Sequence, residues 1–372
     1  MKNSSITTLN ISILTLVTIV YILYIGSSLI IPFIIALLLS LAIISLSNFF
    51  QRKRINKIIS FILSILTFGI IFIIVGNIIN SNINEIIKLA PLYQEKFINI
   101  LTPLFEYLDY FEIDTNILKE KILKNINVGY LIGAITSAVT SVLSITGIIL
   151  FYIVFILLEH RYFSNKLENI FLNNSKKKNI ISVLGHIKND IKSYFVIKSI
   201  TSFSTALLSY IVLTIFGADF ALFWSFLIFL LNYIPTVGSI IAVSFPLLFT
   251  FVQFGFSISF TIIMVSLIGI QITMGNIIEP KFLGNKLNLS PLVIIISLGF
   301  WGSIWGIVGM LLSVPIMVII NIILSHFDST RGIAIMLSEK GELNPDFNII
   351  PIKTKKKGLR QLKDKIKSYY KK

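Results

Sequence analysis

Eight apolar segments recur along this chain, and they constrain its fold more than any other feature of the sequence. A helix needs about 20 mostly apolar residues to cross a lipid bilayer. The segments lie at approximately 9–26, 28–47, 58–80, 136–158, 194–216, 220–252, 256–275 and 291–325. Charged residues make up only 13% of the chain, whereas a soluble domain contains about 25%. The sequence therefore predicts an all-α, polytopic transmembrane protein with about eight membrane segments.

Two of these segments, 220–252 and 291–325, are each about 33 residues long, which is more than one straight crossing needs. Neither contains a polar turn long enough to indicate two crossings. If only one of them crossed twice, the C-terminal tail would move to the outer side of the membrane, against its charge. We therefore expect each long segment to be a single crossing with a broken or re-entrant portion.

The basic residues indicate how the chain is oriented, because cytoplasmic loops carry an excess of Lys and Arg. Stretch 52–57 has no acid, stretch 159–198 has eight bases against three acids, and the tail from residue 328 has twelve against five. In contrast, stretch 81–127 has seven acids and five bases. We therefore expect a membrane protein with both termini in the cytoplasm.

The net charge of +15 does not indicate a nucleic-acid partner, because the bases follow this membrane pattern. The tail 353–372 carries ten bases and one acid, and Leu359, Leu362, Ile366 and Tyr369 fall on one helical face. This pattern indicates an interfacial helix that binds the anionic head groups of membrane lipids. The alternative is a disordered, solvated tail.

The segments divide the chain into four regions. Residues 1–80 hold the N-terminal transmembrane helices, and 81–135 form an extracytoplasmic region of amphipathic helices. Residues 136–327 form the main transport region, which includes a basic cytoplasmic loop near 159–193. Residues 328–372 form the basic cytoplasmic tail.

Two short amphipathic helices are expected in the outer region. One ends before Pro91, and the other follows Asp114, which suits an N-cap and precedes apolar residues at Leu118, Ile122 and Ile126. We expect these helices to pack against the membrane surface or against a neighbouring subunit of a homo-oligomer. The alternative is a role as a gate or in substrate recognition.

Sequence signals for catalysis are missing. The chain contains no H-E-x-x-H motif and no G-x-S-x-G motif, and no cluster has the spacing of metal ligands. The three histidines, His160, His186 and His326, fall in predicted cytoplasmic loops or at helix ends, and there are no cysteines. We therefore expect no enzyme activity, no cofactor and no metal site.

Polar residues at membrane depth are the candidates for function. Glu279 lies between Asn276 and Pro280, in an otherwise apolar stretch that ends at Gly284. Acids at membrane depth are costly, and they usually face a cavity or a partner. Glu279 could be an ion or proton site, or a polar contact with a solute. Alternatively, it could be a structural carboxylate at a helix end, or one that pairs with Lys281.

A second candidate site lies in the middle of segment 220–252, where Asn232 precedes Pro235, Thr236 and Gly238. A proline removes a backbone donor and disrupts the preceding turn of a helix. The carbonyl groups freed one turn earlier could line a cavity, with Asn232 and Thr236 as polar partners. Alternatively, the kink could serve packing alone.

The two long segments resemble one another. Gly238 opens an apolar stretch that ends at a proline, and Gly309 opens a similar stretch that ends at Pro315. Pro291 and Gly306 also interrupt the second segment. A pair of Gly- and Pro-interrupted segments in corresponding positions is a pointer to a transporter binding site.

Three of these motifs together resemble the pattern of the AI-2E family, the autoinducer-2 exporter-like permeases of bacterial membranes. Residues 234–238 are similar to its I-P-x-V-G signature. Residues 279–284 and 289–292 are similar to its E-P-x-x-x-G and L-x-P-L element, and residues 306–315 are similar to its G-x-x-G-x-x-x-x-x-P ending. The order and the spacing agree, and the eight-segment layout covers nearly the whole chain.

The resemblance implies a multi-pass, oligomeric transporter, and members of the family have been linked to export of autoinducer-2 and to sodium/proton antiport. Ser290 and Thr236 depart from the family pattern, which often has His and a bulky aromatic residue there. Our first hypothesis is export of a small polar organic solute past Asn232, Thr236 and Asn276. The alternatives are sodium/proton antiport through Glu279 and a membrane scaffold that transports nothing.

Overall fold

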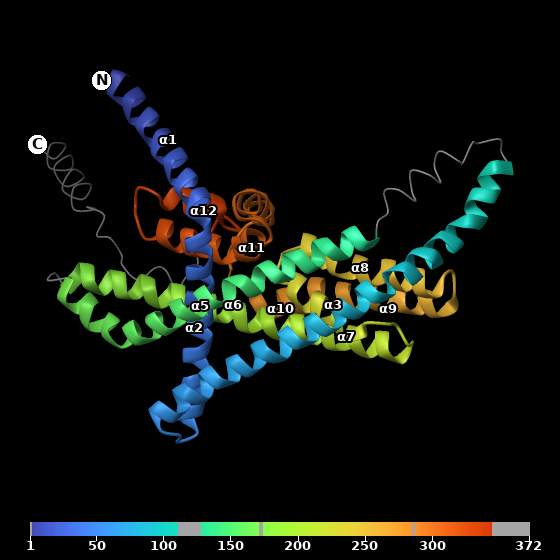
Figure 1. Cartoon of the computed structure of the whole chain (residues 1–372). Coiled ribbons are helices and arrows are strands. Elements are labelled where there is room, and N and C mark those ends of the chain that lie inside the picture. Colours follow the sequence, from blue (N-terminus) through green and yellow to red (C-terminus); the bar gives the residue numbers. More distant parts are fainter. Residues whose placement is uncertain (1, 111–127, 171–173, 285–286, 344–372) are drawn as a thin grey trace, which may run out of the picture.

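The computed structural model describes residues 2–110, 128–170, 174–284 and 287–343, and every regular element within these ranges is helical (Figure 1). The eight apolar segments predicted from the sequence all lie in helices. The elements are α1 (Lys2–Ile25), α2 (Ser27–Arg52), α3 (Lys57–Tyr110), α5 (Val128–Ile170), α6 (Asn174–Ile215), α7 (Ala221–Leu231), α8 (Val237–Phe254), α9 (Ile258–Ile272), the π-helix η1 (Thr273–Ile278), α10 (Glu279–Leu283), α11 (Pro291–Ser325) and α12 (Arg331–Leu337).

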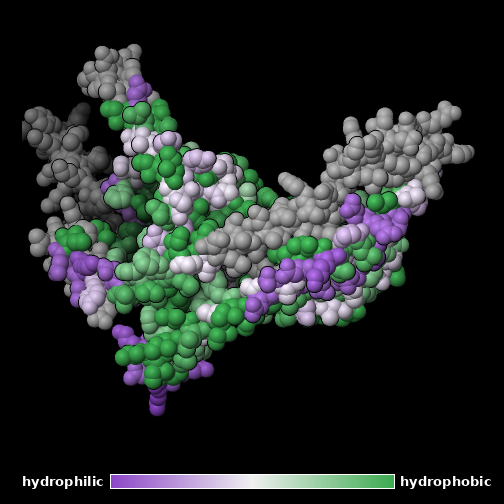
Figure 2. Space-filling model, viewed as in Figure 1, coloured by the Kyte–Doolittle hydropathy of each residue, from purple (hydrophilic) through white to green (hydrophobic). Residues whose placement is uncertain are grey.

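Six of the described helices are long and apolar enough to cross a membrane, and three shorter helices are also apolar. Large hydrophobic side chains are exposed along α1, α2 and the first half of α3, among them Ile58, Ile62 and Ile73. Hydrophilic residues gather instead at the turn between α2 and α3 and along the distal part of α3 (Figure 2). This distribution is typical of helices that face lipid, and it confirms the predicted polytopic helical membrane protein.

The N-terminal segments differ from the two separate helices that the sequence suggests. α2 continues from α1 with a bend between them and without a reversal of direction (Figure 1). The backbone N–H of Gly26 donates to Ile22, and that of Ile30 donates to Gly26, so helical hydrogen bonding continues across the junction. α2 then packs on α3 and α5, and its buried face carries small side chains such as Ala36 and Ser40, which allow close approach of membrane helices.

α3 continues for 54 residues and passes through Pro91 and Pro103 without ending. The predicted helix end before Pro91 is therefore wrong. Ile83 and Ile86 lie in a buried cluster with residues of α6 and α7, and this packing holds the helix together beyond its membrane segment. The second expected outer helix, at 114–126, lies outside the described residues.

The segment 220–252 is broken, as predicted, and its two helices fold back on each other. The rings of Phe220 and Trp224 lie 5.5 Å and 5.2 Å from the ring of Phe249, between centroids. At the other end, a side chain on Gly238 would overlap the carbonyl oxygen of Leu231. α7 and α8 are therefore antiparallel arms of a helical hairpin, which we call the first hairpin, with residues 232–236 at its tip.

The segment 291–325 folds in the same way. Its helix reverses at Gly306, where φ is 60° and ψ is −143°, a conformation that is essentially restricted to glycine. The hydroxyl of Ser297 donates to the carbonyl of Ser313 at 3.2 Å, and a side chain on Gly309 would overlap the carbonyl oxygen of Trp301. Residues 291–305 and 307–325 are thus the arms of a second hairpin.

The expectation of a single crossing for each long segment is therefore wrong. In each hairpin the two arms are antiparallel, so the segment enters and leaves on one side. The turns reverse within a few residues, and glycines allow the arms to touch. A turn of this kind needs no long polar loop, and such a loop was the signal on which the sequence argument relied.

The two hairpins open from opposite ends of α6. The base of the first hairpin packs near the C-terminal end of α6, where Phe223 and Trp224 join the buried cluster of Leu213. At the base of the second hairpin, the ring of His326 lies 6.2 Å from that of His186, near the N-terminal end of α6. Because the two hairpins open from opposite ends of α6, the irregular backbone at their tips lies in the middle of the bundle.

Candidate functional site

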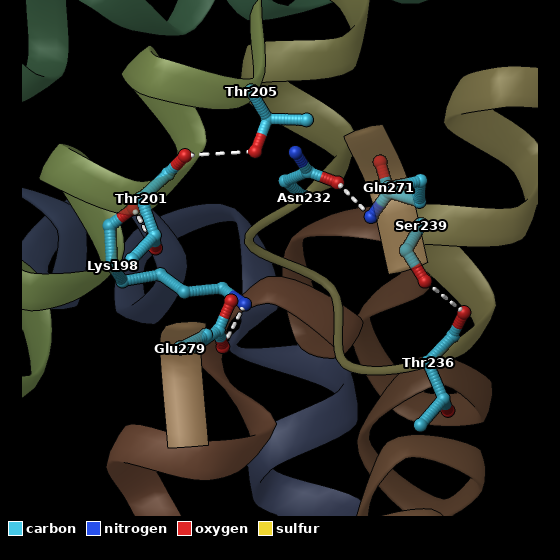
Figure 3. Close-up of polar contacts among 8 residues, drawn as sticks. All are labelled: Lys198, Thr201, Thr205, Asn232, Thr236, Ser239, Gln271 and Glu279. Carbon is cyan, nitrogen blue, oxygen red and sulfur yellow. Dashed lines mark hydrogen bonds and ion pairs between the residues drawn. The ribbon is translucent and has the colours of Figure 1, made fainter. Parts of the chain in front are cut away.

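A buried ion pair lies in the middle of α6. The ammonium group of Lys198 donates to the carboxylate of Glu279 (Figure 3). Lys198 is only 5% exposed, and it is the one charged residue that is buried among those the structure describes. The partner that the sequence suggested, Lys281, is exposed. A pairing with Lys281 is therefore not what the structure shows, because α10 turns Glu279 toward α6.

Pro280 explains the local backbone at this site. Proline has no N–H, so it cannot donate to the carbonyl group of the preceding turn. The chain passes from α9 into the π-helix η1 immediately before Glu279, and α10 is then only five residues long and ends at Gly284. Single π-helical turns inside α-helices are frequent at functional sites. Glu279 therefore lies near the end of the continuous helical segment 258–283, between two irregular points.

Two neutral contacts hold the tip of the first hairpin beside the ion pair. The side-chain amide of Gln271, in α9, donates to the side-chain oxygen of Asn232 at 3.1 Å (Figure 3). The hydroxyl of Tyr233 lies 2.7 Å from that of Ser199, which is the neighbour of Lys198 in α6. The structure thus brings together two predicted residues, Asn232 and Glu279, through α6 and α9.

A row of polar side chains runs along the buried face of α6. It consists of Tyr194, Lys198, Thr201, Ser202, Thr205 and Ser209. Thr201 and Thr205 donate to carbonyl groups of their own helix, at 3.1 Å and 2.8 Å. In contrast, the hydroxyls of Tyr194 and Ser202 and the side-chain oxygen of Gln271 are buried without a hydrogen-bond partner among the described residues. Unpaired buried polar groups are costly, and each one calls for an explanation.

Other predicted residues lie around this cluster without joining it. Asn276, in η1, and Pro280, in α10, are both exposed. Thr236 is also exposed, and its φ of 54° is unusual for a residue other than glycine. Pro235 is half-buried in the tip, and the hydroxyl of Ser239 donates to the carbonyl of Thr236 at 2.7 Å.

The remaining predicted residues build the hairpins. At Gly238 and at Gly309 the two arms come so close that a Cβ would overlap a backbone carbonyl, so the similarity between the long segments reflects a close approach of the arms in both hairpins. Gly306 is the reversal of the second hairpin. Pro291 begins its first arm and Pro315 is buried in its second, and neither contacts the ion pair by any described hydrogen bond. In the structure these residues shape the two hairpins, and their place in a transport pathway stays a prediction.

The sequence argument missed Lys198, Gln271 and the unpaired hydroxyls. Lys198 was counted as the last base of a cytoplasmic loop, but it belongs to the buried face of α6. A signal was present. Ser202, Thr205 and Ser209 follow it at helical spacing inside an apolar segment, and such a polar stripe predicts a face that avoids lipid.

Comparisons with known proteins give the chain its family. Over 260 residues it is 31% identical to a "Putative transport protein" of Borreliella burgdorferi, and this match covers 69% of this chain and 70% of that protein. It is 29% identical over 318 residues to the "AI-2 transport protein TqsA" of Escherichia coli, covering 84% and 90%. It is also 28% identical over 320 residues to a "Putative transport protein" of Haemophilus influenzae, covering 84% and 91%. Residues 13–329 match the AI-2E family transporter family, and the chain therefore belongs to that family of multi-pass membrane transporters.

Proposed function

We propose that this protein exports a small polar organic solute across the bacterial inner membrane. The solute would pass the polar cluster between α6, α9, α10 and the tip of the first hairpin. The observation that carries this proposal is a set of buried, unpaired groups, namely the hydroxyls of Tyr194 and Ser202, one helical turn from Lys198 on either side, and the oxygen of Gln271, whose amide contacts Asn232. A bound solute would give these groups the hydrogen bonds they lack.

The arrangement of the hairpins supports a pathway with access from both sides. By the distribution of basic residues, the N-terminal end of α6 would face the cytoplasm and its C-terminal end the outside. The first hairpin would then open from the outside and the second from the cytoplasm. The C-terminal tail would lie in the cytoplasm, since neither hairpin adds a net crossing between the basic turn after α2 and that tail. A solute could reach the ion pair from either side by movement around one hairpin.

The first solute to test is autoinducer-2, because one relative is named an autoinducer-2 transport protein. Proteoliposomes that contain the purified protein would be loaded with autoinducer-2, and its release would be followed over time. We expect release above that of empty liposomes, and we expect it to fall at least about tenfold in Asn232→Ala, because a polar contact in a buried site would be lost.

A matched control for this experiment is Glu159→Gln. It removes a carboxylate from another Lys–Glu pair, with Lys166, whose two side chains are 54% and 59% exposed. Release should be unchanged in this variant. Equal release from wild type, Asn232→Ala and empty liposomes would exclude autoinducer-2 and send the search to other polar solutes.

Sodium/proton antiport is the second candidate, and the position of Glu279 directly after a π-helical turn favours it. A sodium ion at this carboxylate would have to displace the ammonium group of Lys198. The test imposes a sodium gradient across proteoliposomes and follows internal pH with a dye. A pH change that disappears in Glu279→Gln would establish antiport. No signal from well-inserted protein, together with no flux of any solute, would favour the membrane scaffold instead.

A further inference from the structure

We propose that the ammonium group of Lys198 binds the carboxylate of a small organic acid, in the place that Glu279 now occupies, and that the displaced Glu279 takes up a proton. The inference rests on the proposed function, because it names the chemical class of the transported solute. It also names what moves with that solute, which is one proton for each anion. The argument has three parts, which concern the two partners, their neighbours and the charge.

The two partners of the ion pair differ in how firmly they are held. Lys198 lies in the middle of a helix of 42 residues, and its side chain is 7% exposed. Glu279 lies near the C-terminal end of the continuous helical segment 258–283, just after a π-helical turn and one turn before Gly284, and its side chain is 19% exposed. Lys198 is therefore the more enclosed partner, and Glu279 is the partner that can leave.

The neighbours of Lys198 suit a carboxylate. Tyr194 and Ser202 lie one helical turn before and after Lys198, so all three side chains share one face of α6. Both hydroxyls are fully buried and unpaired among the described residues. An ionised carboxylate accepts several hydrogen bonds and donates none. The ammonium group with the two free hydroxyls can therefore satisfy a carboxylate of a solute better than Glu279 alone does.

The charge balance of the site then couples the binding of an anion to the uptake of a proton. The empty site is neutral, because one ammonium faces one carboxylate. A second carboxylate would leave two negative charges beside one positive charge at membrane depth, where unpaired charges are costly. Two carboxylates that share a site avoid this cost when one is protonated. The other titratable groups nearby are Tyr194 and Tyr233 from α6 and the hairpin tip, and Lys281 on the helix of Glu279 itself.

Other solutes fit the same groups less well. A sodium ion would have to lie against the ammonium group that it displaces. A neutral solute would leave the ion pair in place, and it would gain nothing from the difference in mobility between Lys198 and Glu279. A carboxylate is the group that the site already holds, so its exchange for another carboxylate keeps every hydrogen bond.

Binding can be measured on the purified, full-length protein in detergent. The probes are lactate and succinate, compared with lactamide and succinamide at constant ionic strength set with sodium chloride. Thermal unfolding would report binding, and a pH dye in weak buffer would report proton uptake. We expect the two acids to raise the unfolding temperature, we expect their amides to leave it unchanged, and we expect about one proton to be taken up for each lactate bound.

Two variants separate this proposal from a structural ion pair. Glu279→Gln removes the competing carboxylate, so anion binding should tighten about tenfold or more while proton uptake disappears. Lys198→Met should abolish anion binding, and the double variant Lys198→Met, Glu279→Leu gives the same test in a site without an unpaired charge. Glu159→Gln, at the exposed pair, should behave as the wild type.

The outcomes distinguish this inference from the proposed function. Release of autoinducer-2 without any effect of lactate or succinate would overturn the carboxylate site and leave export intact. Anion binding with proton uptake, in a protein that moves no solute across liposomes, would leave the site intact and overturn export. Equal stabilisation by acids and amides, or weaker anion binding in Glu279→Gln, would refute the exchange of one carboxylate for another.

Discussion

The hydroxyl of Tyr93 donates a hydrogen bond to the carboxylate of Asp219, and it thereby joins α3 to the turn that precedes the first hairpin. The ring of Tyr93 also packs on Phe249, with 4.6 Å between the centroids. The side chain of Gln253 closes the same turn, because it accepts from the backbone N–H of Asp219 at 2.9 Å and donates to Gly217 at 3.0 Å. The base of the first hairpin is therefore fixed to α3, at the end away from its tip.

The hydrogen bond between Tyr93 and Asp219 makes the free energy of unfolding depend on pH above pH 10. Burial, and then the hydrogen bond to Asp219, raises the pKa of Tyr93 above the ordinary value of 10.0. The unfolded tyrosine ionises near pH 10 while the folded one stays protonated, so its stabilising contribution is complete below pH 10 and is lost as pH rises above it. Tyr93→Phe should lower stability by about 1 kcal/mol at pH 8, and the difference from wild type should shrink above pH 10.

Thermal unfolding of both proteins in detergent, from pH 7 to pH 11, measures this difference. Tyr24→Phe is the matched control, because Tyr24 is 59% exposed in α1, and it should match the wild type throughout. A difference between Tyr93→Phe and wild type that stays constant up to pH 11 would contradict the assignment.

The two hairpins predict a specific cost for glycine substitutions. A methyl group on Gly238 or on Gly309 would overlap a backbone carbonyl, which cannot move away as a side chain can. Gly238→Ala and Gly309→Ala should each destabilise the protein by about 1–3 kcal/mol. Gly299 lies in the same second hairpin with open space around it, so Gly299→Ala should be neutral or stabilising by up to about 1 kcal/mol. Equal effects at Gly299 and Gly309 would rule out contact between the arms.

The sequence predicted the elements of this fold better than their directions. Length and apolar composition placed all eight segments in helices, because a bilayer leaves few other solutions for an apolar stretch of about 20 residues. The same composition hid the hairpin at Gly306, since a reversal of the chain there needs one glycine and no polar loop. Pro91 was misleading for a related reason, because packing of Ile83 and Ile86 keeps α3 helical through it.

The candidate site was predicted in part. Glu279 and Asn232 stood out because each is a polar residue in an apolar surrounding, and the structure pairs Glu279 with α6 and Asn232 with α9. Lys198 did not stand out, because it follows a stretch rich in bases and was counted with it. Its partner lies 81 residues away in the chain, and only tertiary structure joins them. The local sequence pattern therefore identified Glu279 and missed Lys198, the base that neutralises it.

The ion pair predicts a non-additive effect on stability. Removal of one partner leaves the other charge buried, which costs about 3–5 kcal/mol, whereas replacement of both by apolar residues is often nearly neutral. Lys198→Met alone should therefore lower the unfolding temperature strongly, and addition of Glu279→Leu should restore most of it. Thermal unfolding of the two single variants and the double variant completes the cycle.

The exposed pair of Lys166 and Glu159 provides the comparison for this cycle. Surface ion pairs contribute about 0–1 kcal/mol, so Lys166→Met and Glu159→Leu should each have a small effect, and their effects should add. Additive and equally small effects at Lys198 and Glu279 would show that water reaches both charges, and they would remove the basis for a buried pair.

A crosslink can test the second hairpin directly, since the chain contains no cysteine that would interfere. The hydroxyl of Ser297 reaches the carbonyl of Ser313 at 3.2 Å, whereas residues 16 apart in one continuous helix would be separated by about 24 Å. A variant with Ser297→Cys and Ser313→Cys should therefore be crosslinked within one chain by a short bifunctional thiol reagent, as measured by mass spectrometry. In a control variant with Ser297→Cys and Ser325→Cys, the second cysteine lies at the base of the opposite arm, and no crosslink should form. Absence of the first crosslink in well-folded protein would favour a straight helix over a hairpin, and it would return segment 291–325 to a single crossing.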